Sequence, residues 1–358
     1  MRPLLALLLL LFLPELRAAS VNTTERTVSK LSDGVYAIRH PDAPDQFPQG
    51  NTTVVIGDRE VLVVDSCYLP SSAREDIAQI RQWTSKPVRY LVNTHWHYDH
   101  TMGNGEYAAA FPGLQIVAHR ETRKHIAGYN PGWFARYHQR NIDFRGELES
   151  GKDAEGKAIT PERRTELQEL MRGRDPVGRE FAAIADRPPT VGFDHSLDID
   201  LGNREVQLRF LGRGNTTGDI VVYLPKEKIL VAGDLLDYPV PYLGGGYPVD
   251  LVATLRRVAD LDTVRIVPGH GEILNDEAHL QNVIAFLSDV VAATEREIYR
   301  VGNGPRNLEA VRAAVEQSID LEKYRRLFAG EDKDNLEFFN GFSLQGVITA
   351  AYAQLWGR

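Results

Sequence analysis

The segment 93–100, with the sequence NTHWHYDH, places three histidines and one aspartate within six residues. It follows the apolar run 88–92, which predicts a buried strand. His95 and His97 are two residues apart and share one face if the backbone stays extended, so a single metal ion can bind both. Asp99 and His100 are adjacent, and a turn there would direct them toward a second metal. Imidazole and carboxylate groups are ligands that zinc accepts.

Three later turns follow the same plan, in which a strand ends at glycines that flank a polar residue. They hold Asn215 (in LGRGNTTGD), Asp234 (in LVAGD) and His270 (in VPGHG). Glycine lets a backbone pass close to a metal or a substrate. Loops at strand ends are also where catalytic groups concentrate. We therefore expect these residues to converge on the histidine segment.

With these turns in this order, the sequence resembles the metallo-β-lactamase-fold hydrolase superfamily over about residues 30–275. His95, His97, Asp99 and His100 match the H-x-H-x-D-H motif of that family, Asp234 its bridging aspartate, and His270 its final histidine. The resemblance implies an α/β fold, namely a four-layer αβ/βα sandwich with the site at one edge of the sheets. It also implies that these six residues bind zinc.

One position departs from the family pattern, because Asn215 stands where the family has its third histidine. A neutral amide oxygen is a poorer zinc ligand than imidazole. The resemblance thus implies one tight zinc site, formed by Asp99, His100, Asp234 and His270, and a second site that is weak or absent. Asn215 is either a weak ligand or a residue that contacts the ligands. Alternatively, a nearby residue such as His195 replaces it, or the protein works with one metal.

The surrounding pattern supplies the elements that hold these residues. Short β-branched runs and helical patterns alternate up to about residue 119, which favours layered α/β packing. Short turns link the strands expected between residues 197 and 232, which indicates an antiparallel meander. Residues 120–190 interrupt this rhythm, and we expect a helical insertion with helices near 161–171 and 176–185. It is either an extra helical layer or a lid or dimer contact. Residues 276–358 are expected to be helical.

Composition and the N-terminal segment indicate which partners and which cellular location to expect. The chain has 358 residues, a formal net charge of −8 and no run rich in lysine or arginine, so nucleic acid and anionic membranes are poor partners. A signal peptide is predicted over 1–20 from Arg2, the apolar run 4–13 and the small residues 18–20. The apolar run is too short to span a membrane and anchor the chain. The mature domain over 21–358 is therefore expected to be secreted or periplasmic. Cys67, the only cysteine, is expected to be a buried side chain, with metal ligation as the alternative.

These features predict an exported zinc-dependent hydrolase that acts on an ester, thioester or amide bond of a small molecule. Zinc lowers the pKa of a bound water to about 7 and thereby supplies hydroxide at neutral pH. Asp99 is the residue expected to orient that water and to accept its proton. Two alternatives stay open: a β-lactamase, and a metal-binding or sensing protein whose hydrolase activity decayed with the loss of the third histidine. The sequence does not define the oligomeric state.

Overall fold

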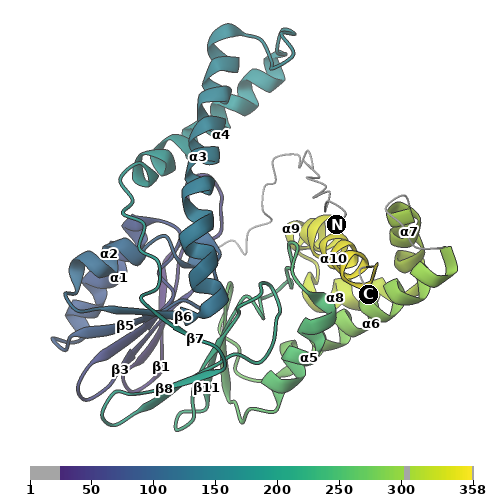
Figure 1. Ribbon diagram of the computed structural model, residues 1–358. Coiled ribbons are helices and arrows are strands. Elements are labelled where there is room, and N and C mark those ends of the chain that lie inside the picture. Colours follow the sequence, from purple (N-terminus) through teal and green to yellow (C-terminus); the bar gives the residue numbers. More distant parts are fainter. Residues whose placement is uncertain (1–24, 302–306, 357–358) are drawn as a thin grey trace, which may run out of the picture.

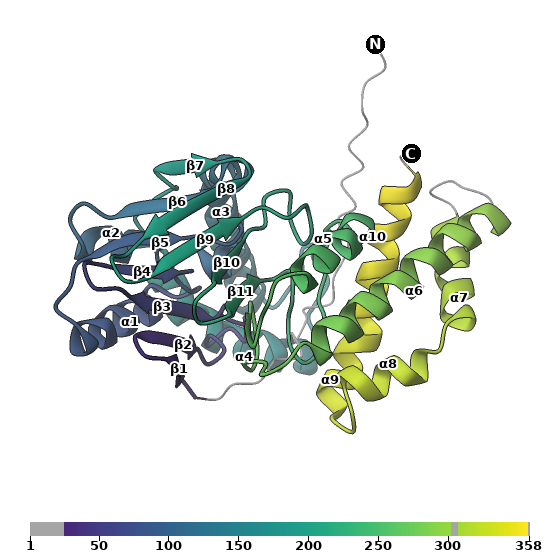
Figure 2. The ribbon, with the colours of Figure 1, turned by 90° about the horizontal axis from the view of Figure 1, so that it is seen from below.

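The computed structural model describes residues 25–301 and 307–356, and within them the strands form two sheets. The first sheet has the order β1-β2-β3-β4-β5-β6-β7, and the second has the order β12-β11-β10-β9-β8 (Figures 1 and 2). The first sheet comprises β1 (Thr27–Ser32), β2 (Val35–Arg39), β3 (Thr52–Ile56), β4 (Val61–Val64), β5 (Val88–Val92), β6 (Gln115–His119) and β7 (Val191–Phe193). The second comprises β8 (Ser196–Asp200), β9 (Glu205–Arg209), β10 (Val221–Leu224), β11 (Ile229–Gly233) and β12 (Arg265–Pro268).

The type of strand pairing changes once within each sheet, from antiparallel to parallel. Strands β1 to β4 are antiparallel, whereas β4 to β7 run parallel. Strands β8 to β11 form the expected antiparallel meander, and β12 then lies parallel to β11. Parallel neighbours present their carboxyl ends at the same edge of a sheet, which is where α/β proteins place their ligands.

The helices are α1 (Pro70–Trp83), α2 (Asn104–Ala110), α3 (Arg120–Ser150), α4 (Pro161–Phe181), α5 (Pro248–Ala259), α6 (Ala278–Val301), α7 (Leu308–Ser318), α8 (Leu321–Phe328), α9 (Lys333–Phe338) and α10 (Leu344–Trp356). A short 3₁₀ turn, η1 (Tyr98–His100), lies within the histidine segment. None of the helices in the described part of the chain is long and apolar enough to cross a membrane.

Three apolar clusters show how the layers stack. One lies between the sheets and contains Val64 and Val92 from the first sheet and Val222 and Val231 from the second. A second lies between the first sheet and helices α1 and α2, and a third between the second sheet and helices α5 to α10. Helix, sheet, sheet and helix follow one another, so the predicted four-layer α/β sandwich is confirmed.

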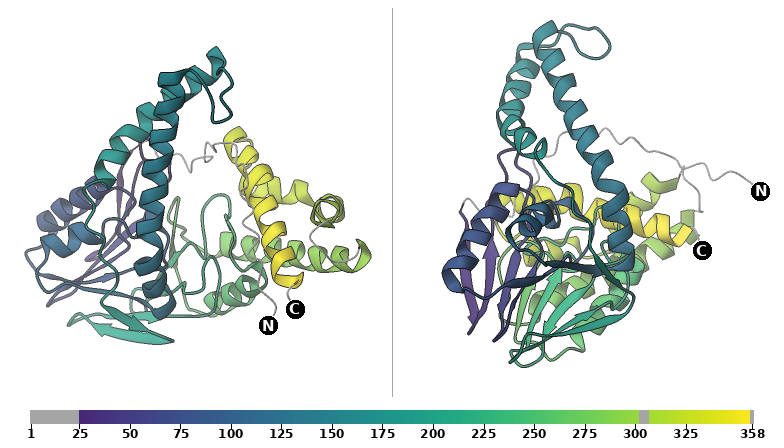
Figure 3. Two further views of the ribbon diagram at one scale, coloured as in Figure 1. Left: turned by 45° about the horizontal axis from the view of Figure 1, so that its top comes forward. Right: turned by 60° about the vertical axis from the view of Figure 1, so that its left-hand side comes forward.

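Residues 120–181 form a helical hairpin, α3 and α4, that projects from the sandwich (Figures 1 and 3). Here the structure differs from the expected break before Pro176, because α4 runs through this proline as one helix. A proline removes one helical hydrogen bond, but Val177 and Phe181 beyond it are buried in an aromatic cluster. Their packing holds the last turn in place.

Candidate metal centre

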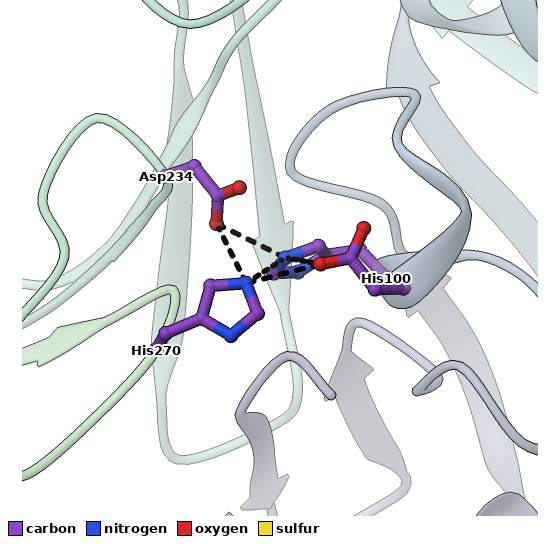
Figure 4. Close-up of side chains that lie close together, drawn as sticks. His100, Asp234 and His270 are labelled. Atoms are coloured by element: carbon purple, nitrogen blue, oxygen red, sulfur yellow. Dashed lines mark hydrogen bonds and ion pairs between the residues drawn. The ribbon is translucent and has the colours of Figure 1, made fainter. Parts of the chain in front are cut away.

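Both sheets contribute predicted metal-ligand residues to the site, four from the first sheet and two from the second. The histidine segment follows β5, whereas Asp234 follows β11 and His270 follows β12. Figure 4 shows Asp234 and His270 facing His100 across the junction between the sheets. Residues more than 130 positions apart along the chain therefore meet at one edge of the sandwich.

Asp99, His100, Asp234 and His270 form a compact group that could hold a metal ion. His100 Nε2 lies 3.0 Å from Asp234 Oδ1, 3.2 Å from His270 Nε2 and 3.6 Å from Asp99 Oδ2. His270 Nε2 lies 3.0 Å from Asp99 Oδ2 and 3.7 Å from Asp234 Oδ1. Four ligands placed tetrahedrally about zinc at their usual bond lengths would be about 3.3 Å apart. The group therefore has the size of a zinc coordination shell.

His95 and His97 form a second group with the other carboxylate oxygen of Asp234. Asp234 Oδ2 lies 3.2 Å from His95 Nε2 and 3.9 Å from His97 Nδ1. Asp234 thus faces both groups, one through each oxygen. This is the arrangement that a bridging carboxylate requires.

Asp65 orients His100, a role that was not predicted from the sequence. Its Oδ2 accepts a hydrogen bond from His100 Nδ1 at 2.9 Å, and its Oδ1 accepts one from the Thr94 backbone N–H at 2.8 Å. A carboxylate only accepts, so Nδ1 of His100 carries the proton and the lone pair of its Nε2 faces the metal group. The available signal was an aspartate directly after the buried strand β4.

Thr94 sets the orientation of His95 in the same way. Its hydroxyl donates its single proton to Asp65 Oδ2 at 2.7 Å, so it must accept from His95 Nδ1, which lies 3.0 Å away. The unprotonated Nε2 of His95 then faces the carboxylate of Asp234, and this buried nitrogen has no hydrogen-bond partner. Two hydrogen-bond acceptors, His95 Nε2 and the Asp234 carboxylate, face each other there, and a cation between them would interact favourably with both.

Asn215 occupies the remaining corner of the second group. Its amide Nδ2 lies 3.2 Å from Asp234 Oδ2 and 3.3 Å from His97 Nδ1, and its buried Oδ1 has no partner. The two ends of an amide have nearly the same shape, and a half-turn would direct the oxygen at both neighbours. Asp219 fixes this turn by accepting from the N–H groups of Gly214 and Thr216. Asn215 is therefore placed where it could act as a weak ligand.

The electrostatic field of the site favours cations. Burial alone would lower the pKa of His100, but three surrounding carboxylates, with Asp234 first, raise it well above its ordinary value. The same balance raises the pKa of His270 to about 9. Burial opposes ionisation of Asp234, yet the neighbouring imidazoles hold its pKa well below the usual range. Protons and metal ions compete for such nitrogens, so metal binding would release protons.

Two glycines leave room for this arrangement. A Cβ atom added at Gly50 would overlap the ring of His100, and one added at Gly269 would overlap Asp234 Oδ1.

His195, the alternative ligand predicted from the sequence, lies away from the site. It is exposed in the turn between β7 and β8 and belongs to none of the metal-ligand groups among the described residues. The geometry thus supports Asn215, and not His195, as the residue at the altered corner.

Comparisons with known proteins point to one superfamily. The family profile described as the metallo-beta-lactamase superfamily matches residues 45–270. A linear primary-alkylsulfatase from a Pseudomonas species is 25% identical over 246 residues, which cover 65% of this chain and 43% of the relative. A type 2 metallo-beta-lactamase of Bacteroides fragilis is 39% identical over 90 residues, which cover 24% of this chain and 36% of the relative. The chain spans less than half the length of these two relatives.

Among solved structures, the chain is similar to a metallo-beta-lactamase from Pontibacter korlensis. The TM-score is 0.53 at 19% identity, and the match covers 74% of this chain and 99% of that chain. At this level of identity the likeness shows a shared fold. The match covers nearly all of that chain, so the rest of the present chain lies outside the shared core.

Proposed function

The chain belongs to the metallo-beta-lactamase superfamily, whose members are metal-dependent hydrolases, and on this basis we propose that it is a zinc-dependent hydrolase of an ester, thioester or amide bond. The observation that carries the proposal is the orientation of the imidazole lone pairs. Asp65 and Thr94 turn the Nε2 atoms of His100 and His95 toward the two oxygens of Asp234. Such a donor set, with imidazole and carboxylate on all sides, suits zinc.

Zinc bound there would lower the pKa of a water to about 7 and stabilise negative charge on the substrate as a Lewis acid. The residues of the chain supply position and proton transfer. Burial opposes ionisation of Asp99, but His100 and His270 lower its pKa, so it is a carboxylate at neutral pH. Its Oδ2 lies 3.0 Å from His270 Nε2, which fixes its orientation. These contacts support the proposed role of Asp99, which is to orient the attacking water and to accept its proton.

The substrate bond separates this proposal from two alternatives. The similarity to a metallo-beta-lactamase over 90 residues favours a lactam as the second candidate substrate. The similarity to an alkylsulfatase makes a sulfate ester a bond worth including in an assay. A metal-binding or sensing protein would bind zinc at the same residues without turnover.

Measuring turnover on a small panel of substrates distinguishes these functions. The panel contains a nitrophenyl carboxylate ester, a thioester, a chromogenic cephalosporin and a nitrophenyl sulfate. We expect zinc-dependent hydrolysis of a carboxylate ester or a thioester, and Asp99→Asn should reduce kcat by about 10²-fold or more. His138→Ala, which changes an exposed histidine on α3, serves as the control. Zinc retention without any turnover would favour the sensing alternative, and turnover of the cephalosporin alone would favour the lactamase.

Export is part of the proposal and rests on the sequence of residues 1–20, which lie outside the described residues. A charged start, a short apolar run and small residues are typical of a cleaved signal peptide. Expression of the full chain in a bacterial host should give a mature protein that begins near residue 19–21. N-terminal sequencing of the periplasmic fraction tests this, and an intact Met1 in the membrane pellet would indicate an anchor instead.

A further inference from the structure

A second group of ligand-type side chains lies in the layer between the first sheet and helix α1. His40 directly follows β2, Cys67 follows β4, and Asp76 belongs to α1. All three are buried, with exposed fractions of 2%, 0% and 0%. They form a metal-ligand group that shares no member with the groups around Asp234.

The group has the dimensions of one coordination shell. His40 Nε2 lies 3.1 Å from Cys67 Sγ and 3.2 Å from Asp76 Oδ2, and Cys67 Sγ lies 3.5 Å from Asp76 Oδ2. The hydroxyl of Thr52, on β3, adds a fourth corner at 3.3 Å from His40 Nε2 and 3.4 Å from Cys67 Sγ. Tetrahedral zinc would space nitrogen and oxygen ligands by about 3.3 Å, and sulfur from either of them by about 3.5 Å, so the distance between His40 and Cys67 would lengthen by about 0.4 Å on zinc binding.

The convergence on one nitrogen argues for an ion at the centre. His40 Nε2 offers either one proton or one lone pair, yet three polar atoms surround it within 3.3 Å. A relay of the Cys-His-Asp kind would use both ring nitrogens, one for each partner. In this group the sulfur of Cys67 and the carboxylate of Asp76 both contact the same nitrogen, Nε2 of His40. That geometry fits a shared cation better than a catalytic relay.

The charges around the group are compatible with a metal ion. Arg26 binds the far oxygen of Asp76, with Nη2 2.8 Å from Oδ1, and this leaves Oδ2 for the group. A partner that holds the outer oxygen of a carboxylate ligand in this way fixes its orientation. Imidazole, thiolate and carboxylate together suit zinc, whereas magnesium and calcium prefer oxygen alone. We infer that His40, Cys67 and Asp76, with Thr52 at the fourth corner, form a buried structural zinc site separate from the candidate metal centre.

The inferred site and the metal centre share one loop of the chain, although they share no ligand. Asp65, which orients His100, and Cys67 are two residues apart in the loop after β4. Both adopt left-handed backbone conformations, with φ of 59° and 69°, which residues other than glycine rarely do. A zinc ion on Cys67 would hold this strained loop in place. The total zinc content of the protein would then exceed that of the metal centre by one.

Cobalt substitution can detect this site because the chain has a single cysteine. Any thiolate-to-cobalt charge-transfer band in the near ultraviolet must therefore come from Cys67. We expect the cobalt-loaded full chain to show this band and Cys67→Ser to lose it. His270→Ala, which disrupts the metal centre alone, should retain the band while its visible d–d absorption changes.

Zinc content gives an independent readout. After dialysis, Cys67→Ser should hold about one zinc fewer per chain than the wild type, with an unchanged circular dichroism spectrum. X-ray absorption of the wild-type zinc protein should show a sulfur neighbour at about 2.3 Å. These wild-type measurements decide the matter even if the variant does not fold. A folded, cobalt-loaded wild type without a thiolate band would show that the cluster is only hydrogen-bonded, and loss of the band in His270→Ala would overturn the independence of the two sites.

Discussion

Asn215 contacts both His97 and Asp234, so the nature of its side chain determines how well this corner can bind a cation. The amide nitrogen lies 3.2–3.3 Å from both neighbours, a distance typical of two ligands that bind the same metal ion. An amide oxygen is neutral and a weak zinc ligand, whereas imidazole is a strong one. We therefore expect the two ligand groups to bind a cation with unequal affinity, the tighter binding being at Asp99, His100, Asp234 and His270.

Asn215→His tests this inequality. We expect the variant to retain one additional zinc per chain after dialysis, with the weaker affinity rising by about tenfold or more, equivalent to about 1.4 kcal/mol. Metal analysis of both proteins in the Cys67→Ser background excludes the inferred structural site. Gln82→His, on the exposed face of α1, controls for an added histidine. Two zinc ions held equally by the wild-type centre would falsify the impaired-site interpretation.

Asp42 gives the site region a dependence on pH. Burial raises the pKa of this carboxyl from 3.8 to about 6, although His270 acts in the opposite direction. The folded protein thus holds the proton more tightly than the unfolded chain, so stability falls as pH rises from about 4 to about 6. Asp42→Asn stays neutral and should raise the free energy of unfolding by about 1–2 kcal/mol at pH 7.5, after allowance for solvent screening.

The gain from Asp42→Asn should vanish at pH 4, where the wild-type carboxyl is protonated. Urea unfolding in the presence of a chelator at both pH values measures it. Glu331→Gln, which neutralises an exposed carboxylate, is the control and should show no such difference. An equal gain at both pH values would mean that the effect comes from side-chain packing and not from ionisation.

The spacing of the ligand residues could be read from the sequence, but the residues that orient them could not. His95, His97, Asp99 and His100 stand together in one short segment, and the structure places them together. The tautomer of His100, by contrast, depends on Asp65, which lies 35 positions away on another loop. Such hydrogen bonds arise only when the strands align. No local pattern around an aspartate at a strand end reveals which histidine it will contact.

At the scale of elements, the helical hairpin is fastened to the sandwich by an aromatic cluster. Trp133 stacks on Tyr98 of the histidine segment with ring centres 4.4 Å apart. Beneath these rings, the hydroxyls of Tyr68 and Tyr137 both donate to Asp45 Oδ2, at 3.1 and 2.9 Å. Asp45 therefore joins α3 to the loop after β4. A role of the hairpin as a lid stays a prediction.

Asp45→Ala should weaken this attachment. It leaves two buried phenol hydroxyls without their shared acceptor, so we expect a loss of about 2–3 kcal/mol in the free energy of unfolding. Chemical denaturation measures the loss, and faster hydrogen exchange in residues 120–140 should accompany it. Asp175→Ala is the matched control, because it breaks an exposed ion pair with Arg145 on the same hairpin and should cost less than about 1 kcal/mol. Equal costs for both would mean that Asp45 does not anchor the hairpin.

Elements with local signals were predicted more accurately than those set by packing. The meander from β8 to β11 was evident from short turns between apolar runs, and it is confirmed. The passage of α4 through Pro176 was not, because local chemistry favours a break at proline. The three-residue strand β7 was also missed, since its pairing with β6 is a tertiary contact.

For the whole molecule, the candidate metal centre joins the two sheets. His95, His97, Asp99 and His100 come from the first sheet, and Asp234 and His270 come from the second. An ion bound between them must be released when the sheets separate on unfolding. A ligand that binds only the folded state stabilises it by an amount that grows with its concentration.

Zinc should therefore raise the melting temperature of the whole chain. At a free concentration of 100 times the dissociation constant the gain is about 2.7 kcal/mol. For a chain of 358 residues, that corresponds to a shift of about 4 °C relative to the same protein in a chelator. His270→Ala removes the ligand that follows β12 and should lose most of the shift, whereas the exposed His138→Ala should keep it. Thermal scans of the three proteins, each in the Cys67→Ser background, measure the shift. A full shift in His270→Ala would contradict the assignment of the tight ion to the junction between the sheets.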